Sequence, residues 1–417
     1  MTTKAGTAIL AIVMAACIGH GPGEDPPPAR HGSRVRPGIT VLLQDSMALV
    51  RGKRIALITN QTGVNERGVS DIDLLARADL HLVRIFSPEH GLRGREDRSF
   101  VGNTVDSSTG IPVYSLYGKT VLAPPDSLLT DLDFLVFDLQ DVGVRTWTYV
   151  GTLMKALRSC ARLHVPIIVL DRPNPLTGSH VQGAMLDSAI ADTAGPFALY
   201  PMPLRHGLTM GELARFYNDT LALHAALHVI PARGWRRDLW WDETHLVFVP
   251  PSPNLPSLES EIVYPAVVPF ESTNLSVGRG TPEAFQQLGA PWLDAPAVVS
   301  QLASLGLLGV RFRPTEFTPD HPSDGKYGGR RLSAVRIEVT DRDRLDVGRV
   351  GAALLWAVAK VNRDSLRVDT LGFDLRFGSG ALRASLMQGA DPDAALDKTI
   401  PADLAFERRS RRFWLYH

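Results

Sequence analysis

Short apolar segments in the first half of the chain repeatedly end in a cluster of polar residues. Four of them are rich in β-branched side chains and are followed directly by acids, amides, His, Arg, Gly or Pro. Apolar runs of this length, bounded by turn-forming residues, predict buried strands. These predicted strands span 54–59, 81–86, 134–137 and 166–170.

Segments with helical spacing alternate with these strands. The pattern predicts helices over 70–77, 149–163 and 209–218, and a further strand over 227–230. Alternation of this kind favours a parallel sheet with helices on both faces. We therefore expect an α/β fold over 39–245.

The remainder of the chain has a different pattern. It opens with a Pro-rich stretch over 250–256 and then contains a strand with alternating polarity over 334–339 and a helix over 347–361. A chain of 417 residues is long enough for two domains. The sequence therefore predicts a second, smaller α+β domain over 246–417 that closes a cleft against the first.

The polar residues after the predicted strands are the first candidates for a site. The carboxyl ends of parallel strands lie along one edge of a sheet, and ligands bind in the crevice there. We therefore expect these residues to lie close together. They are Glu89, His90, Gln140, Asp141, Arg145, Asp171, Arg172 and Asn174.

The N-terminus has the features of an export signal. Lys4 precedes an apolar stretch over 8–16, which is too short to cross a bilayer because a spanning helix needs about 20 residues. Cys17 follows small residues, as in a bacterial lipobox. We expect a signal peptide and lipobox over 1–17, a lipid anchor on Cys17 and a Pro- and Gly-rich tether over 18–38. The chain would then be a periplasmic or cell-surface lipoprotein, with plain secretion as the alternative.

Charge and cysteine content limit the classes of partner. The 44 Lys and Arg residues balance 44 Asp and Glu residues, which gives no reason to expect nucleic acid, and a membrane is expected only through the lipid anchor. Cys160 is the second of two cysteines and lies in a predicted helix, so we expect a buried thiol. Disulfides are not expected to stabilise the fold.

Several common catalytic motifs are absent from the sequence. It has no Gly-x-Ser-x-Gly elbow, no His-Glu-x-x-His, no phosphate-binding loop with Gly-Lys-Ser/Thr, and no Gly-x-Gly-x-x-Gly after the first strand. No cofactor is therefore expected. The His, Asp and Glu residues lack the tight spacing of metal ligands, so no metal is expected either.

Carboxylate chemistry remains as the best interpretation of these residues. A glycosidase general acid needs a raised pKa, which partial burial provides. Glu89, between Pro88 and His90 on the turn after the second predicted strand, is the leading candidate. A second carboxylate across the sugar ring would complete such a site. The available acids are Asp138, Asp141, Asp171 and Glu271.

Other side chains could support this chemistry. The candidates are His90 and His206 for proton relay, Arg145, Arg205 and Arg279 for binding a substrate carboxylate, and Trp147 and Tyr149 for stacking on a sugar. Each group has a structural interpretation too. Acids after strands often cap helices or form turns, Glu212 fits a capping box with Thr209, and aromatic residues can simply pack the sheet. The residues alone predict a hydrolase-like cleft for a polar, partly anionic ligand.

A series of short strings along the chain resembles the NamZ-type exo-β-N-acetylmuramidases. Together they cover roughly residues 39 to 417 in one order, and the series is highly specific although each string alone is weak. The strings are 59–63 (TNQTG), 86–94 (FSPEHGLRG), 114–118 (YSLYG), 137–145 (FDLQDVGVR), 170–175 (LDRPNP), 205–214 (RHGLTMGELA), 251–254 (PSPN) and 274–281 (NLSVGRGT).

The resemblance implies a Rossmann-like domain joined to a smaller C-terminal domain, with the cleft between them. It implies an exo-acting glycoside hydrolase that releases N-acetylmuramic acid from the non-reducing end of peptidoglycan fragments. The Glu of the SPEHG string is the family's leading catalytic candidate and corresponds to Glu89. Its proposed partners in catalysis are His90, Asp141 and Asp171.

The proposed substrate contacts extend over both halves of the chain. They are Asn60, Arg93, Gln140, Arg145, Tyr149, Arg172, Asn174, Arg205, His206, Asn254, Glu271, Asn274 and Arg279. The sequence leaves open whether the second catalytic group is a carboxylate or the substrate's own 2-acetamido group. Two rival functions also stay open: a cell-wall esterase or amidase, and a peptidoglycan-binding lipoprotein without turnover.

Overall fold

The computed structural model describes residues 1–2, 34–97, 102–118, 122–192 and 195–417. Residues 34–417 form one compact unit. Residues 3–17 of the predicted signal peptide, with Cys17, and most of the predicted tether lie outside the described residues.

A seven-stranded sheet forms the core of the first domain, with strand order β3-β4-β2-β1-β5-β6-β7. All neighbouring strands are parallel except β3, which pairs antiparallel with β4. The strands are β1 (Ile55–Thr59), β2 (Leu82–Ser87), β3 (Thr104–Val105), β4 (Pro112–Ser115), β5 (Phe134–Asp138), β6 (Ile167–Leu170) and β7 (Leu227–Ile230). Every residue of β1, β5 and β6 is buried, because helices cover both faces of the sheet. The predicted α/β fold and its five strands are confirmed.

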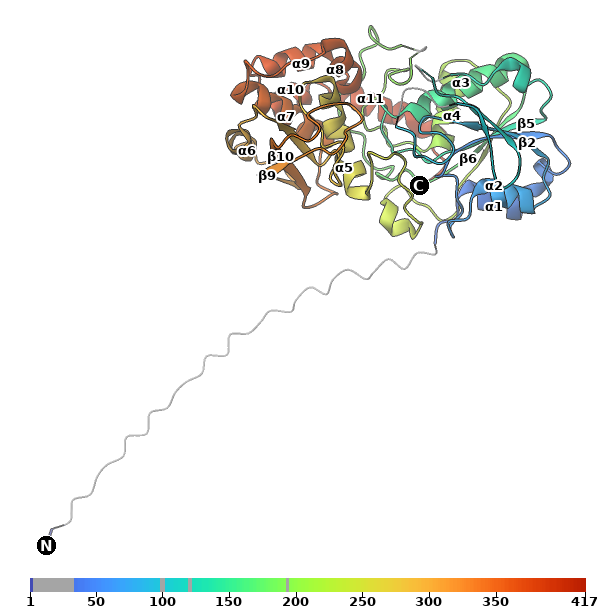
Figure 1. The fold of residues 1–417 in the computed structure, drawn as a ribbon, viewed down its shortest axis with the longest axis horizontal. Coiled ribbons are helices and arrows are strands. Elements are labelled where there is room, and N and C mark those ends of the chain that lie inside the picture. The colour runs from blue at the N-terminus through green and yellow to red at the C-terminus, as the bar shows by residue number, and fades with distance from the viewer. Residues whose placement is uncertain (3–33, 98–101, 119–121, 193–194) are drawn as a thin grey trace. The chain divides into compact units, whose positions relative to one another are not determined.

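Two pairs of helices enclose this sheet. Helices α1 (Gly38–Asp45) and α2 (Asp71–Arg77) pack on one face, and α3 (Thr148–Leu163) and α4 (Met210–Thr220) pack on the other (Figure 1). Alternate residues of β1 serve the two faces, so that Ile55 and Leu57 join the first cluster while Ala56 and Ile58 join the second.

Local sequence signals define an end of each of the helices α3 and α4. The Thr209 side chain accepts from the Glu212 N–H and the Glu212 side chain accepts in return, which confirms the predicted capping box of α4. Helix α3 ends at His164 in the left-handed conformation, with φ 54°. Cys160 on α3 is a fully buried free thiol, as predicted, and burial raises its pKa to about 12.

The second domain contains a three-stranded antiparallel sheet in the order β8-β10-β9, built from Gln287–Ala290, Leu332–Val339 and Val310–Phe317 respectively. Its helices are α5 (Leu258–Val267), α6 (Ala295–Ala303), α7 (Val347–Val361), α8 (Thr370–Phe377), α9 (Gly380–Met387) and α10 (Pro392–Asp397). Short 3-10 helices are η1 (Met47–Leu49), η2 (Asp126–Leu128), η3 (Trp241–Thr244), η4 (Val268–Ser272) and η5 (Arg411–Phe413). One apolar cluster continues through both domains, so the two share a core.

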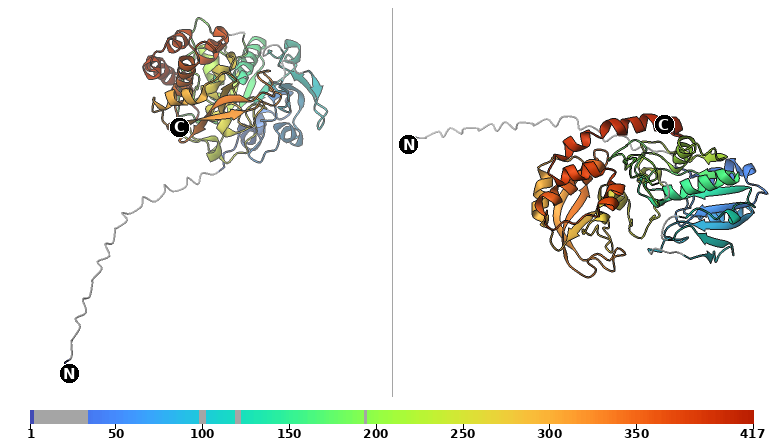
Figure 2. Two further views of the ribbon diagram at one scale, coloured as in Figure 1. Left: turned by 60° about the vertical axis from the view of Figure 1, so that its left-hand side comes forward. Right: turned by 90° about the horizontal axis from the view of Figure 1, so that it is seen from above.

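The end of the chain returns to the first domain. Helix α11 (Ile400–Ser410) leads back across the molecule toward the parallel sheet (Figure 2). The Leu415 N–H donates to Glu212 Oε1 at 2.9 Å, and the Tyr416 hydroxyl donates to Asp171 Oδ2 at 2.7 Å. The last residues are therefore part of the first domain's packing, although the sequence pattern assigns them to the second.

The fold also begins earlier than the composition predicts. Val35 is buried and its N–H donates to Thr244 O, while Gly38 starts α1 against the backbone of Leu170 and Asp171. A Cβ at Gly38 would lie 2.5 Å from Asp171 N, so only glycine fits this approach. Residues 34–38, which the sequence places in the tether, belong to the folded domain.

No helix in the described part of the chain combines the length and apolar character that a bilayer-spanning segment requires.

Candidate functional site

A cavity of about 190 Å³ lies between the two domains. The first domain contributes the turn after β2, the start of α3 and part of the loop between β6 and α4. The second domain contributes η4, the loop after it and the end of α8. The lining residues are Glu89, His90, Asp97, Tyr117, Thr146, Trp147, Thr148, Pro196, Phe197, Ser252, Asn254, Leu255, Tyr264, Val268, Glu271, Arg279, Phe285 and Arg376.

Glu89 enters this cavity from the turn after β2. The turn is tight, with His90 at φ 68° and Gly91 at φ 71°, so it projects the carboxylate away from the sheet edge. Thr148 Oγ1 donates to Glu89 Oε2 at 2.5 Å, and the Tyr117 hydroxyl also bonds to the Glu89 side chain. Burial and the nearby Glu89 charge raise the pKa of Tyr117, so this phenol stays protonated and able to donate.

Aromatic rings form one side of the cavity next to Glu89. Trp147 packs edge-on against Tyr149 and Tyr264, with ring centroids 5.4 and 5.8 Å apart. His90 lies against Trp147 at 6.4 Å, and its Nδ1 is 2.8 Å from Glu96 O. Such a surface is suited to a sugar ring, which has an apolar face and a polar rim.

A half-buried ion cluster also lines the cavity. Arg279 donates to Glu271 Oε1 through both Nε and Nη2, and Arg376 Nε lies 3.6 Å from Glu271 Oε2. Burial alone would raise the pKa of Glu271, but the two guanidinium groups bring it below its ordinary value. Glu271 is therefore a charged partner of two arginines.

Asp97 is a further charged carboxylate in this cavity. Asn254 Nδ2 donates to Asp97 Oδ2 at 2.6 Å, and Arg279 Nη1 lies 3.8 Å from the same oxygen. Burial raises the pKa of Asp97, and hydrogen bonds from Ser323 and Asn254 more than offset this, so the net pKa is lowered. The cavity thus combines Glu89, an aromatic face and a cluster of fixed charges.

Six of the residues singled out from the sequence line the cavity: Glu89, His90, Trp147, Asn254, Glu271 and Arg279. Sequence reasoning missed several polar lining residues, among them Asp97, Tyr117, Thr148 and Arg376. Tyr117 lies within the 114–118 string and Thr148 directly follows Trp147, so both had a nearby signal. Asp97 and Arg376 lie outside every string and had none.

Asp171 lies outside the cavity in a closed hydrogen-bond network. Its carboxylate is fully buried and accepts from Thr209 Oγ1 at 2.7 Å, from Gly211 N at 2.7 Å and from the Tyr416 hydroxyl at 2.7 Å. Burial raises its pKa to about 6 despite these hydrogen bonds. The predicted catalytic acid therefore joins the N-terminus of α4 to the end of the chain.

Arg172 is likewise occupied by the fold. Its Nε donates to Asp138 Oδ1 at 2.5 Å, and the side chains of both residues are at most 3% exposed. This pair connects the ends of β5 and β6.

Asp141 and His206 form a third buried group. His206 Nε2 lies 3.5 Å from Asp141 Oδ2, which also accepts from Gly143 N at 2.8 Å. His206 is fully buried and Asp141 is 4% exposed, and neither lines the cavity. This arrangement fixes the loop after β5 instead of contacting the cavity.

Two of the three predicted carboxylate-binding arginines are also buried in the protein. Arg145 donates to Leu375 O at 2.7 Å and to Arg376 O at 3.0 Å. Arg205 donates to Gln182 Oε1 at 2.9 Å and stacks over Trp240 at 5.1 Å. Burial lowers the pKa of both. Of the three, only Arg279 reaches the cavity.

The other predicted contacts bond to the protein itself and do not line the cavity. Amide side chains bridge loops: Asn60 to Tyr149 and Thr62, Gln140 to Pro173, Asn174 to Leu208 and Leu176, and Asn274 to Ser365 and Arg367. Arg93 pairs with Asp106 at 2.8 Å.

The usual ligand crevice of an open α/β sheet is filled by the chain. The strand order changes direction between β1 and β5, where such folds bind their ligands. Here Trp241, Leu246 and Val247 cover Thr62 and Gln140, and leave a space of only about 10 Å³. Sequence reasoning located the correct sheet edge. Because the crevice between β1 and β5 is filled, however, the open cavity lies beside the turn after β2.

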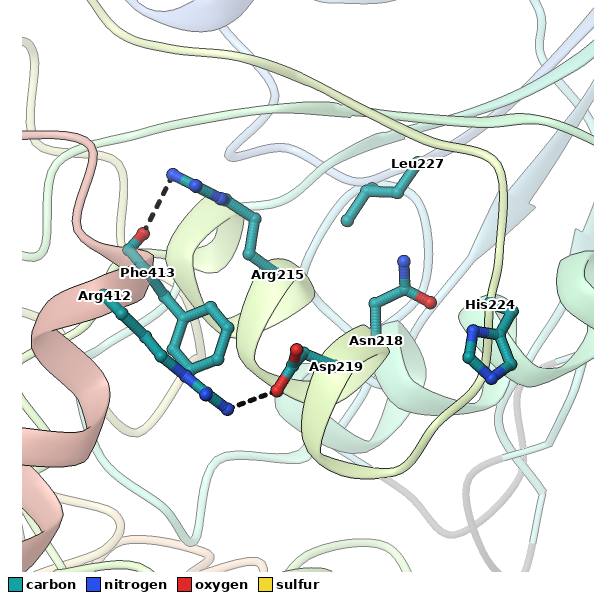
Figure 3. A pocket seen from close by; sticks show the side chains of 7 residues that line it. All are labelled: Arg215, Asn218, Asp219, His224, Leu227, Arg412 and Phe413. Atoms are coloured by element: carbon teal, nitrogen blue, oxygen red, sulfur yellow. Dashed lines mark hydrogen bonds and ion pairs between the residues drawn. The ribbon is translucent and has the colours of Figure 1, made fainter.

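A larger hollow of about 560 Å³ lies elsewhere, between α4 and η5 (Figure 3). Arg412 pairs with Asp219, and Arg215 donates to Phe413 O at 3.2 Å. Asp219 is the only carboxylate among the residues that line it, so the hollow offers no pair of acids for glycosidic chemistry.

The structure favours neither metal chemistry nor acyl transfer at this cavity. Across the described ranges, no three His, Cys, Asp or Glu side chains are grouped as metal ligands. A Ser-x-x-Lys sequence at 323–326 lies beside the cavity, but Lys326 Nζ donates to Glu271 O at 2.8 Å and to Leu275 O at 3.0 Å. This lysine is therefore engaged by backbone carbonyls and does not activate Ser323 for acyl transfer.

Comparison with known proteins links this architecture to one family. Models of the N-terminal and C-terminal domains of the exo-β-N-acetylmuramidase NamZ match residues 55–259 and 262–416. The chain is 38% identical over 386 residues to the peptidoglycan β-N-acetylmuramidase NamZ of Bacillus subtilis strain 168, and the match covers 92% of each chain.

Two solved structures have a similar fold. Both are DUF1343 family proteins from Bacteroides fragilis, with a TM-score of 0.84 at 32% identity for one and 0.75 at 28% identity for the other. Each match covers 92% of this chain and 99% of the solved one.

Proposed function

Because the chain belongs to the NamZ family of exo-β-N-acetylmuramidases, we propose that it is an exo-acting glycoside hydrolase of peptidoglycan fragments. Its product would be the N-acetylmuramic acid at the non-reducing end. The observation that supports this most is Glu89, a carboxylate with two hydroxyl partners inside a cavity that has an aromatic side and a charged side.

Glu89 acts as the general acid in this proposal. It gives its proton to the glycosidic oxygen as the bond to the anomeric carbon breaks and positive charge develops on the sugar. Thr148 and Tyr117 hold the carboxyl group in one orientation, which lowers the entropy cost of reaching the productive geometry. Trp147 and Tyr264 support the sugar ring.

Asp97 is the second carboxylate that the cavity offers. Both carboxylates are charged, but Glu271 is paired with two arginines, whereas Asp97 is bonded to Asn254 and Ser323 and has only Arg279 nearby, at 3.8 Å. It would either activate a water molecule or orient the substrate's 2-acetamido group for attack on the anomeric carbon. The anomer released first, observed by NMR, distinguishes the two: direct attack by an activated water inverts the anomeric configuration, and the acetamido route retains it.

The proposed location is outside the cytoplasmic membrane. Export and a lipid anchor on Cys17 rest on the signal-like N-terminus, whose residues lie outside the described part of the chain. Mass spectrometry of the protein from membranes would find a lipidated N-terminal Cys17 if the proposal holds. A mature N-terminus at another residue would contradict it.

A direct assay tests the function. Purified mature protein is incubated with para-nitrophenyl β-N-acetylmuraminide or with the matching glucosaminide, and the Glu89→Gln variant serves as control. The proposal expects release from the muraminide, little from the glucosaminide and none above background from the variant. If muropeptides bind without any sugar release, the protein is a binding lipoprotein. Hydrolysis of a chromogenic ester that is unaffected by the variant would instead indicate an esterase.

A further inference from the structure

We infer that Arg376 recognises the lactyl carboxylate of the terminal N-acetylmuramic acid and that Arg145 positions it. The inference rests on the proposed function, because it concerns how the same cavity distinguishes a muramyl from a glucosaminyl residue. The two sugars differ by a lactyl ether, which adds one negative charge, so selectivity requires a cation that is still available to the substrate.

Arg376 is such a cation. It lines the cavity from the last turn of α8, with a side chain 22% exposed. Its Nη1 donates to Ser272 Oγ and Gly372 O, both at 3.1 Å, whereas its Nη2 makes no hydrogen bond to the described residues. Nη2 therefore keeps its N–H donors for a ligand, and an anionic carboxylate is the acceptor that such a charged donor binds most strongly.

Arg279, the arginine predicted from sequence, is less available. Nε and Nη2 donate to Glu271, and Nη1 donates to Ser323 Oγ at 3.2 Å and lies near Asp97. All of its nitrogens are engaged by the protein. Its role is to balance Glu271 and Asp97, which leaves the charge of Arg376 only partly compensated by Glu271 at 3.6 Å.

The orientation of Arg376 is fixed from two sides. Its guanidinium lies over the Phe197 ring at 4.9 Å, so the ring restricts the plane of the fork. From behind, the two Arg145 nitrogens bond to the carbonyls of Leu375 and Arg376 at the end of α8. These carbonyls would otherwise lack partners at a helix C-terminus, where a cation is favoured.

This contact connects the two domains at the site. Arg145 ends the loop after β5 in the first domain, and α8 belongs to the second. A fully buried arginine without an acidic partner is costly, and the carbonyls of the helix end offset that cost here. Arg145 therefore acts as a positioning residue. The sequence predicts that it binds the substrate directly, but here it acts on the substrate through Arg376.

The test separates the carboxylate from the rest of the lactyl group. Three chromogenic substrates are compared: the N-acetylmuraminide, its lactyl methyl ester, and the N-acetylglucosaminide. Arg376→Met should lower kcat/KM for the muraminide about 10- to 100-fold, the range expected for one hydrogen-bonded charge pair, and change the other two by less than about 3-fold. Arg376→Lys should recover part of the loss, because it keeps the charge without the fork.

Arg383→Met is the matched control. Arg383 also pairs with α8, through Asp374 at 2.6 Å, but it does not line the cavity. Its removal should leave the preference for muraminide over ester unchanged. Arg145→Met should raise KM for the muraminide with little change in kcat, and it should not affect the ester, a pattern that general loss of stability would not produce.

The outcomes are distinguishable from failure of the function itself. A wild-type protein that releases nothing from any of the three substrates overturns the proposed function. A wild-type protein that prefers the muraminide, together with an Arg376→Met variant that keeps the same preference, overturns this inference and leaves the function intact. Should Arg145→Met not fold, the Arg376 variants decide the question alone.

Discussion

Two clusters of polar residues at the same sheet edge differ in how the protein uses them. Around Asp171, Thr209, Gly211 and Tyr416 supply hydrogen bonds until the carboxylate is fully enclosed. Around Glu89, only side-chain hydroxyl groups are in place, and one side stays open to a cavity. The comparison teaches that an acid at a strand end can react with a ligand only when the protein leaves some of its hydrogen-bonding positions unfilled.

The arginines show the same contrast. Arg172 is bonded to Asp138 in the protein interior, while Arg376 retains an edge without a protein partner among the described residues. The sequence pattern singled out Arg172, which follows a strand, and gave no signal for Arg376. The predictions below test this contrast, beginning with the largest effect.

The strongest test replaces each of the two acids, Glu89 and Asp171, by its amide. Glu89→Gln should reduce kcat/KM for the muraminide about 10³-fold, because the general acid is lost, while the free energy of unfolding changes by less than about 1 kcal/mol. Asp171→Asn should do the reverse: it lowers stability and leaves kcat/KM of the folded protein within about 3-fold. Progress curves and urea unfolding measure both. If Asp171→Asn abolished activity in folded protein, the contrast would be wrong.

The buried ion pair gives the second test. Asp138→Asn removes the direct ion-pair partner of Arg172 in the interior, where the buried Asp71 carboxyl is the nearest remaining acid, and should lower the free energy of unfolding by about 3–5 kcal/mol. Arg279→Met should lower the free energy of unfolding by less, because the cluster of Arg279, Glu271 and Arg376 is partly open to water. A stability loss in Asp138→Asn no larger than that of Arg279→Met would contradict the enclosed character of the first region.

A smaller effect is expected from the hydroxyl groups that hold Glu89. Tyr117→Phe removes one hydrogen bond to the carboxyl group and should lower kcat about 10-fold with KM nearly unchanged. Tyr200→Phe, outside the cavity, is a control of the same chemistry. An equal effect of the two substitutions would show that Tyr117 acts through packing alone.

The smallest effect concerns Asp403, a half-buried acid in neither region. Burial, with a further contribution from Asp346, raises the pKa of Asp403 to about 7. The folded chain therefore holds a proton that the unfolded chain releases near pH 4, so this group's contribution to stability is full below about pH 4 and is lost as the pH rises through about 7.

Asp403→Asn cannot titrate and should lack this decline. Its melting temperature relative to wild type should rise between pH 5 and pH 8, by up to a few degrees, while activity stays unchanged. A difference that is constant over this pH range would show that Asp403 does not hold its proton in the folded chain. Asp403 would then show that a carboxyl group can have a raised pKa without a catalytic role.

The sequence determined more of the fold than of the site. The strands over 55–59, 134–138 and 167–170 were predictable because their apolar runs are continuous and each is followed by a turn. The shared edge of the sheet follows from parallel pairing. What the pattern could not show is that residues 241–247 fill the crevice at β1 and β5 and leave the opening beside β2.

Long-range partners account for the rest. Tyr416, at the end of the chain, closes the network of Asp171, and no local pattern connects residues that lie 245 positions apart. Arg376 lies in a short helix without any motif, and it becomes a candidate only because Arg145 fixes that helix end against the first domain. Glu89 was found because its turn, with a proline before it and two left-handed residues after it, has a distinct local sequence.

The most direct test of the account is the crystal structure of the Glu89→Gln variant with a bound disaccharide of N-acetylmuramic acid and N-acetylglucosamine. The account predicts the muramyl ring against Trp147, the glycosidic oxygen within hydrogen-bond distance of the side chain at position 89, and the lactyl carboxylate on Arg376. A disaccharide bound elsewhere, or bound with its glycosidic oxygen turned away from position 89, would contradict it.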